Sequence, residues 1–207
     1  MRVWRPESCA AALAARDSRV AAIVEAVGAP AIRTRPSTFE AIARSIAYQQ
    51  LTGKAAGTIW GRALDLFPDR RATAEATLAL SEAKLRSAGL SRAKVLAIRD
   101  LAAHIQDGRV KPRALWRMSD EEVIATLVQV RGIGPWSAHM HLVFSLRRPD
   151  VWPTGDLGVR KGLQRIFKTR ATPDAARSER LGRPFAGHRT TLAWYCWRSL
   201  ELSSGAR

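Results

Sequence analysis

The sequence predicts an all-α protein, and three observations support this fold class. Apolar residues recur every three or four positions along nearly the whole chain, which is the spacing of one helix face. Serine and glutamate stand three positions apart, as in a helix-capping box, at two places. The chain contains no convincing alternating strand and no two-residue hairpin turn. Because 46% of the 207 residues are hydrophobic, a packed core is expected rather than disorder.

The first clear helix begins near residue 37. Ser37-Thr38-Phe39-Glu40 matches the capping box, with Ser37 as the N-cap and Glu40 reaching back to it. The apolar residues that follow keep helical spacing, and they are Phe39, Ile42, Ala43, Ile46 and Ala47. Gly53 interrupts this pattern, which then resumes until Pro68.

The middle of the chain predicts three further helices. Residues 81–88 form a short one that is stopped by Gly89. Ser91 then caps a longer helix, and Gly108 ends it. Ser119-Asp120-Glu121-Glu122 is the second capping box and opens a third helix.

The C-terminal part is predicted to be helical as well. A helix starts at Pro135, a residue type that is tolerated at a first helical position. Another starts at Asp156 or its neighbour, and the last covers about 189–200. Between them, residues 168–188 are polar and contain two prolines, so a surface loop with a short helix is expected there.

The net charge predicts a polyanionic partner. Lys and Arg outnumber Asp and Glu by 34 to 18, for a formal charge of +16. Nucleic acid is favoured over a membrane, because no segment resembles a basic interfacial helix and no apolar run could span a bilayer. A surface that is basic by proteome composition alone would give the same count. The alanine-rich N-terminus reads as a helix and lacks a cleavage site, so a cytoplasmic protein is expected, nucleoid-associated if prokaryotic.

Few residues suit a metal or cluster. Cys9 and Cys196 are too few for a disulfide framework, a four-cysteine zinc site or an iron–sulfur cluster. His139 and His141 fall on different faces of one predicted helix, so zinc is not expected there. No cofactor is predicted to be required.

A glycine-containing turn joins two predicted helices as a helix-hairpin-helix. Gly132 and Gly134 permit close approach and positive φ, so that their N–H groups can point outward together. Ile133 between them would anchor the turn in the core. With the positive end of the second helix and Ser137 in its first turn, the hairpin is predicted to bind a phosphate oxygen without reading a base. The glycines alone also fit a tight helical corner without a ligand.

The hairpin does not stand alone in the sequence. "LVQVRGIGPWSA", followed by "FSLRRPDVWPTGDLG", resembles the helix-hairpin-helix DNA glycosylase superfamily. Trp136 and Asp156 stand twenty positions apart, a spacing similar to the 3-methyladenine DNA glycosylase II (AlkA-type) branch. "SIAYQQLTGKAAGTIWGRAL", "GLSRAKVLAIRDLA" and "FAGHRTTLAWYCWR" resemble further elements of that branch. The resemblance covers most of the chain, from about Phe39 to Arg198.

The resemblance implies a bilobal helical fold with the active-site cleft between the lobes. We expect a helical bundle lobe over about 52–150, with the helix-hairpin-helix at 119–147. Residues 1–51 and 151–207 would form the other lobe of a single minimal unit, since too few residues precede Phe39 for the β-rich domain of larger relatives. The implied partner is double-stranded DNA, bound by a monomer.

The resemblance also implies the chemistry. Asp156 matches the catalytic aspartate, whose carboxylate would stabilise positive charge on the sugar as the base leaves. An ordinary N-cap aspartate is the alternative for this residue. Trp136 stands where strand-cutting relatives carry a nucleophilic lysine, so a monofunctional hydrolase without lyase activity is expected. Lys161 lies nearby in sequence but does not match that position, and we expect it to meet phosphate or solvent.

The expected substrate is an alkylated purine, 3-methyladenine or 7-methylguanine, flipped out of the duplex to leave an abasic site. Such a base is cationic, and Trp136, Met140 and His188 are the candidate walls of its pocket. Core packing is the alternative for each of them. Trp194 and Trp197 on the last helix are assigned to the core.

Three residues at a break between helices are candidates for the wedge that fills the vacated stack. Gln50 is preferred, followed by Leu51 and Gln49, and a solvent-exposed helix end is the alternative. Hairpin carbonyls in the family can hold a monovalent cation, which implies a Na⁺ or K⁺ site at Val128, Val130 and Ile133. Two other functions stay open: a non-catalytic helix-hairpin-helix DNA-binding protein, and a glycosylase for a deaminated or oxidised base.

Overall fold

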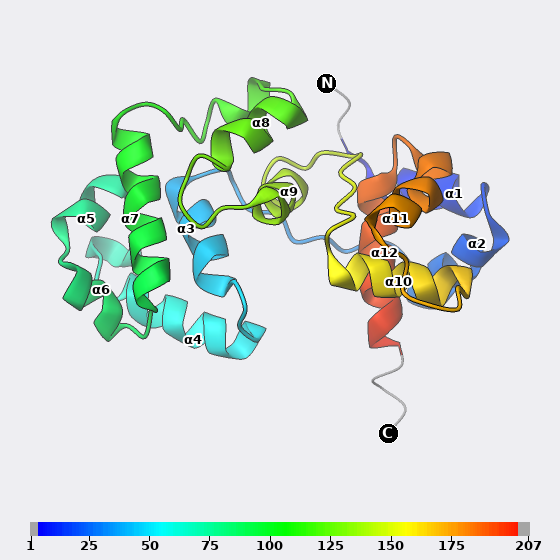
Figure 1. Cartoon of the computed structure of the whole chain (residues 1–207), viewed down its shortest axis with the longest axis horizontal. Helices are drawn as coiled ribbons and strands as arrows, with labels where there is room; N and C mark the ends of the chain where they lie inside the picture. The colour runs from blue at the N-terminus through cyan, green and yellow to red at the C-terminus, as the bar shows by residue number, and fades with distance from the viewer. Residues whose placement is uncertain (1–3, 203–207) are drawn as a thin grey trace. The chain divides into compact units, whose positions relative to one another are not determined.

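The computed structural model describes residues 4–202, and this part of the chain is helical with no strand (Figure 1). Its α-helices are α1 Pro6–Ala14, α2 Ser18–Val27, α3 Phe39–Tyr48, α4 Gly53–Leu64, α5 Ala74–Ala79, α6 Glu82–Ser87, α7 Arg92–Gln106, α8 Asp120–Leu127, α9 Pro135–Phe144, α10 Leu157–Phe167, α11 Ala175–Gly182 and α12 Arg189–Glu201. Three 3₁₀ turns are Pro68–Arg70, Leu115–Arg117 and Arg183–Phe185. The predicted all-α class is confirmed. None of the described helices combines the length and apolar character that a membrane crossing needs.

The chain divides into two compact units. The hairpin unit is residues 35–146, and the aspartate unit combines the N-terminal residues up to 34 with those from 147 onward. We expected residues 35–51 to join the terminal segments, and the structure corrects this boundary. The reason is packing, because α3 contacts α4, α7 and α9, all of which belong to the hairpin unit.

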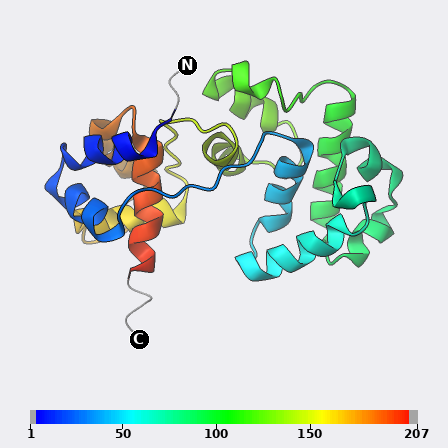
Figure 2. The same ribbon diagram turned by 180° about the vertical axis from the view of Figure 1, so that it is seen from behind.

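The hairpin unit is organised around α3 and α7, which lie side by side (Figure 2). The capping box at Ser119 is confirmed, with both reciprocal bonds to Glu122. The one at Ser37 is wrong by one residue, because Thr38 is the N-cap and accepts from the Ala41 amide at 3.2 Å. Ser37 is buried instead.

Long-range contacts explain this correction. The Ser37 hydroxyl donates to the carbonyl of Pro112 at 2.8 Å and lies 3.0 Å from Nε2 of His141 on α9. Glu40 accepts from the Ala72 amide at 3.3 Å rather than from its own helix start. Both side chains therefore join distant segments, and Thr38 is left to cap α3.

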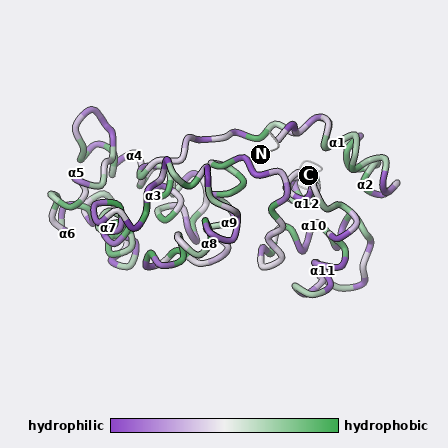
Figure 3. The backbone as a smooth tube through the Cα atoms, turned by 90° about the horizontal axis from the view of Figure 1, so that it is seen from above, coloured by the Kyte–Doolittle hydropathy of each residue, from purple (hydrophilic) through white to green (hydrophobic). Residues whose placement is uncertain are grey.

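The aspartate unit has its own core between α1, α2, α10 and α12. At Gly162 a Cβ would lie 2.4 Å from Cα of Cys196, so α10 crosses α12 at backbone contact. The segment 168–188 contains the short helix α11, as predicted. Figure 3 shows hydrophobic and hydrophilic residues alternating along the helices of both units, the pattern that predicted them.

Candidate active site

The two hairpin glycines have different backbone conformations. Gly132 has φ +77°, and a Cβ there would lie 3.1 Å from Cβ of Ala97 on α7. Gly134 is the N-cap of α9 with φ −95°, and a Cβ there would meet nothing within 4 Å. The prediction of positive φ is therefore right for Gly132 and wrong for Gly134. The chain's own packing demands glycine only at the first position.

Two of the four hairpin amides donate hydrogen bonds within the protein, and the other two do not. The Arg131 amide donates to Oδ2 of Asp100 at 2.8 Å, and the Ile133 amide donates to the Val130 carbonyl at 3.0 Å. Within residues 4–202, the Gly132 and Gly134 amides have no acceptor. These two N–H groups and the start of α9 are thus available to an outside anion.

Gln49 holds the hairpin rather than projecting from the protein. Its Nε2 donates to the Gly132 carbonyl and to Oγ of Ser137, each at 3.0 Å. The Ser137 side chain is buried, so it braces the turn from inside and only its backbone can meet a phosphate. The assignment of Gln49 as a wedge candidate is therefore corrected, because its amide group is already occupied.

Gln50 and Leu51 remain exposed at the turn after α3. Lys94 on α7 donates from Nζ to the carbonyls of Ala47 and Gln49, both at 2.8 Å, which ends α3 firmly. Partial burial lowers the pKa of Lys94. Beyond it Gln50 adopts φ +56° and Leu51 is 40% exposed. Gln50 and Leu51, the two preferred wedge candidates, therefore follow a helix end that the Lys94 hydrogen bonds hold in place.

Trp136 and Met140 lie one helical turn apart on the same side of α9. Trp136 is 44% exposed and Met140 is half-buried, while His141 and Leu142 on the other side are buried. Core packing therefore does not account for Trp136. Burial lowers the pKa of His141 to about 4, so this histidine is neutral near pH 7.

Asp156 is the N-cap of α10, as predicted, and only 8% of it is exposed. Its Oδ1 accepts from the Val159 amide at 2.7 Å, which is the capping bond. The same oxygen accepts from Nε1 of Trp197 on α12 at 2.9 Å. The carboxylate is thus held by the start of one helix and by a side chain of another.

The assignment of Trp197 to the core is incomplete. Its ring is half-buried and packs against the core of the aspartate unit, but its N–H group serves Asp156. A Cβ at Gly158 would lie 2.8 Å from Cδ1 of Trp197, so glycine is needed there for the indole to reach the carboxylate. The neighbouring thiol of Cys196 is fully buried, and this burial, with the nearby charge of Asp156, raises its pKa. Trp194 is a core residue, as assigned.

His188 is not brought next to Asp156. It is the N-cap of α12, nine residues before Trp197, which is about 13 Å along the helix axis. There it lines a separate hollow of about 360 Å³ with Trp4, Cys9 and Pro149. Its predicted place in the base pocket gains no support from this geometry.

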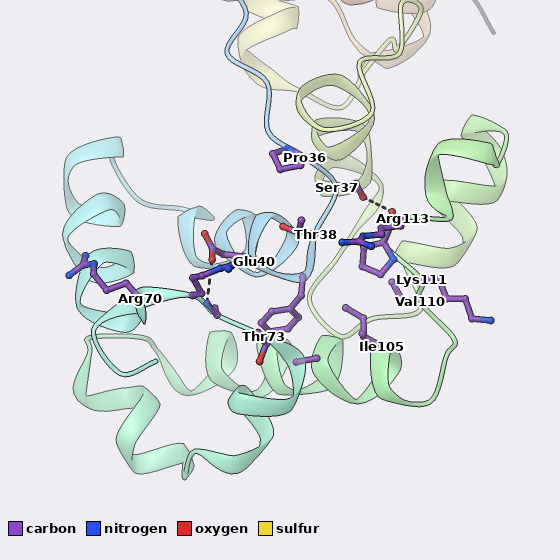
Figure 4. A pocket seen from close by; sticks show the side chains of 15 residues that line it. Pro36, Ser37, Thr38, Glu40, Arg70, Thr73, Ile105, Val110, Lys111 and Arg113 are labelled. Atoms are coloured by element: carbon purple, nitrogen blue, oxygen red, sulfur yellow. Dashed lines mark hydrogen bonds between the residues drawn. The ribbon is translucent and has the colours of Figure 1, made fainter. Parts of the chain in front are cut away.

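A larger hollow of about 780 Å³ lies in the hairpin unit (Figure 4). Thr38 and Phe39 at the start of α3 line it, together with Ile105 near the end of α7. None of the predicted site residues contributes to its walls. It lies at the end of α3 opposite Gln49 and is separate from the hairpin.

No group of three or more His, Cys, Asp or Glu in the described part of the chain could hold a metal ion. The cation implied at the hairpin would need the carbonyls of Val128, Val130 and Ile133. The Val130 carbonyl already accepts the turn bond, and its second lone pair is compatible with a cation. This site stays a prediction.

Comparison with known proteins agrees with the arrangement of these motifs. A family model described as HhH-GPD superfamily base excision DNA repair protein matches residues 43–186, which include both the hairpin and Asp156. The chain belongs to this superfamily. DNA-3-methyladenine glycosylase 1 of Schizosaccharomyces pombe is 32% identical over 171 residues, covering 80% of this chain and 73% of that protein.

Two solved structures extend the agreement to the whole HhH-GPD fold. A Schizosaccharomyces pombe 3-methyladenine DNA glycosylase in complex with abasic DNA superposes with a TM-score of 0.86 at 28% identity, covering 97% of this chain and 100% of that one. A DNA-3-methyladenine glycosidase from Bacillus halodurans gives a TM-score of 0.84 at 30% identity, with 100% and 95% covered. Within the superfamily, the chain belongs to the DNA-3-methyladenine glycosylase family of base excision repair.

Proposed function

We propose that this protein is a monofunctional DNA glycosylase. It hydrolyses the N-glycosidic bond of 3-methyladenine and 7-methylguanine flipped out of double-stranded DNA and leaves an abasic site. The observation that carries this proposal is Asp156, a carboxylate held in place by Val159 and Trp197 within a chain of the DNA-3-methyladenine glycosylase family. We further propose that it acts as a monomer and requires no cofactor.

The chemistry follows from the position of the carboxylate. As the base leaves, positive charge develops on the sugar, and a fixed negative group beside C1′ stabilises it. Asp156 caps the positive end of α10, which attracts the negative charge that this role requires. Because an alkylated purine is already a good leaving group, little acid catalysis is needed, and water completes the reaction as the nucleophile.

The hairpin unit supplies the DNA contacts in this proposal. The Gly132 and Gly134 amides and the start of α9 bind a backbone phosphate, and the open space at Gly134 admits it. Gln50 or Leu51 fills the gap left by the flipped nucleotide. The exposed ring of Trp136 supplies a wall for the cationic base by cation–π contact.

The test is base release from methylated duplex DNA by the wild type and by Asp156→Asn. Asparagine keeps the helix cap but removes the charge, so release should fall by at least about a hundredfold while DNA affinity is kept. Asp174→Asn is the matched control, because Asp174 also caps a helix, α11, and accepts from the Arg177 amide. It should release bases at the wild-type rate. Equal release by wild type and Asp156→Asn would overturn the catalytic assignment.

The absence of lyase activity has its own measurement. An amine nucleophile forms a Schiff base with an abasic site, and borohydride reduces it to a stable protein–DNA adduct. Tryptophan has no such amine, so Trp136 should leave the wild type without an adduct under conditions that trap a bifunctional glycosylase. A trapped adduct would contradict the monofunctional mechanism.

A further inference from the structure

We propose that Trp197 is a positioning residue for the reaction, which orients the Asp156 carboxylate through its indole N–H. This inference rests on the proposed function, because it assigns to Asp156 the catalytic role described above. It adds a second helix, α12, to the machinery that holds the acid.

The hydrogen bonds show why one donor is insufficient. The capping bond from the Val159 amide, at 2.7 Å, comes from the carboxylate's own helix start. Capping alone restrains one oxygen and leaves rotation of the carboxyl group about its axis. The indole N–H reaches the same Oδ1 at 2.9 Å from another helix, and two donors from different directions restrict this rotation.

The backbone around the pair is shaped for this contact. Gly158 lies two residues after Asp156, and a Cβ there would lie 2.8 Å from Cδ1 of Trp197 and 3.0 Å from Oδ1 of Asp156. Gly158 lies in the first turn of α10, and glycine is a poor helix former. Alanine at this position would stabilise the helix more. The glycine is explained by the space that the indole occupies.

Four ionisable side chains near the pair on α10 and α12 are uncharged, exposed or bonded elsewhere. Cys196 on α12 is fully buried, and this burial raises the pKa of its thiol so that it stays uncharged. Arg160 on α10 donates to the Pro173 carbonyl, and Lys161 is exposed. Arg198 on α12 pairs with Glu201. The Trp197 indole donates to Oδ1 from α12, whereas Arg160 and Arg198 bond to other partners.

The first test compares the single-turnover rate of 7-methylguanine excision with the affinity for duplex DNA that carries an abasic-site analogue. In Trp197→Phe the ring remains but the donor is lost, so the rate constant should fall on the order of tenfold while the affinity stays that of the wild type. Gly158→Ala should also lower the rate constant, because its methyl group would lie 2.8 Å from Cδ1 of Trp197 and 3.0 Å from Oδ1 of Asp156.

Trp194→Phe is the matched control, since Trp194 is a buried tryptophan of the same helix. It should lower the melting temperature and leave the single-turnover rate constant as in the wild type. If Trp197→Phe excises at the wild-type rate, or loses rate only in proportion to its loss of DNA affinity, the tryptophan has only a structural role and the proposal is overturned.

A second measurement separates this inference from the proposed function. The Trp197 indole N–H signal in a ¹H–¹⁵N spectrum, assigned through Trp197→Phe, should change position in Asp156→Ala, which removes the acceptor. A signal at the same position in the wild type and in Asp156→Ala would overturn the contact even if Asp156 proves essential. A signal that changes position, combined with full excision by Asp156→Asn, would refute the proposed function and leave the contact standing.

Discussion

The two units each present the start of a helix, and they use it in opposite ways. In the hairpin unit, α9 starts at Gly134, which has no side chain, and the amides of Gly132 and Gly134 have no acceptor within the described residues. In the aspartate unit, α10 starts at Asp156, whose own carboxylate occupies the equivalent place. One positive helix end is open to an outside anion, and the other is filled by the chain.

This difference teaches how one physical effect can serve two tasks. A helix start attracts negative charge whether the charge comes from DNA or from a side chain. The open start of α9 suits the binding of a phosphate, while the cap of α10 holds the carboxylate of Asp156 at a fixed place. The comparison predicts that an acidic cap on α9 should weaken phosphate binding without destabilising the fold.

The largest effect is therefore expected for Gly134→Asp, which gives α9 the same kind of cap as α10. The added side chain meets nothing within 4 Å and can accept from the first-turn amides, so stability should rise by about 0.5–1 kcal/mol. DNA affinity should fall on the order of a hundredfold, because the new carboxylate repels the phosphate. Gly134→Ser, a neutral cap, should lose much less affinity. Denaturation and salt-dependent binding measure the two quantities, and unchanged affinity in Gly134→Asp would mean that the hairpin does not hold phosphate.

A smaller effect concerns pH, because α9 buries a histidine. The pKa of His141 is about 4 in the folded protein, below the ordinary histidine value of 6.5, so below pH 6.5 the unfolded state takes up a proton that the folded state excludes. Stability is thus complete near pH 7 and declines as the pH falls towards 4. Between pH 7 and pH 5 this amounts to about 2 kcal/mol.

Urea denaturation at both pH values measures this decline. His141→Gln should lose less stability than the wild type over the same interval, because glutamine does not titrate. His139, whose pKa burial also lowers, is present in both proteins, so the difference isolates His141. An identical decline in the two proteins would show that His141 is not responsible.

The smallest effect distinguishes the two hairpin glycines. Gly132→Ala places a methyl group at positive φ and 3.1 Å from Ala97, so the free energy of unfolding should fall by about 1–2 kcal/mol. Gly61→Ala in α4 is the control, since a Cβ there meets nothing within 4 Å and alanine favours a helix. If both variants are equally stable, the close approach of Gly132 to α7 is not what requires glycine.

The sequence by itself determined most of the helices but not α5, and it determined the capping box at Ser119, the helix-hairpin-helix and the place of Asp156 at a helix start. Each of these depends on interactions within about four residues, such as apolar spacing, capping and glycine turns, and such interactions leave a local pattern. The resemblance to known motifs added the expected role of Asp156, which no local pattern distinguishes from an ordinary cap.

Only the tertiary structure decided which side chains serve these motifs. Trp197 reaches Asp156 across 41 positions, and Gln49 reaches Gly132 across 83. Ser37 likewise left the cap of α3 to contact Pro112 and His141. Contacts of this kind form when separate helices pack against each other. The sequence around a hydrogen-bonding side chain does not indicate which distant residue it will contact.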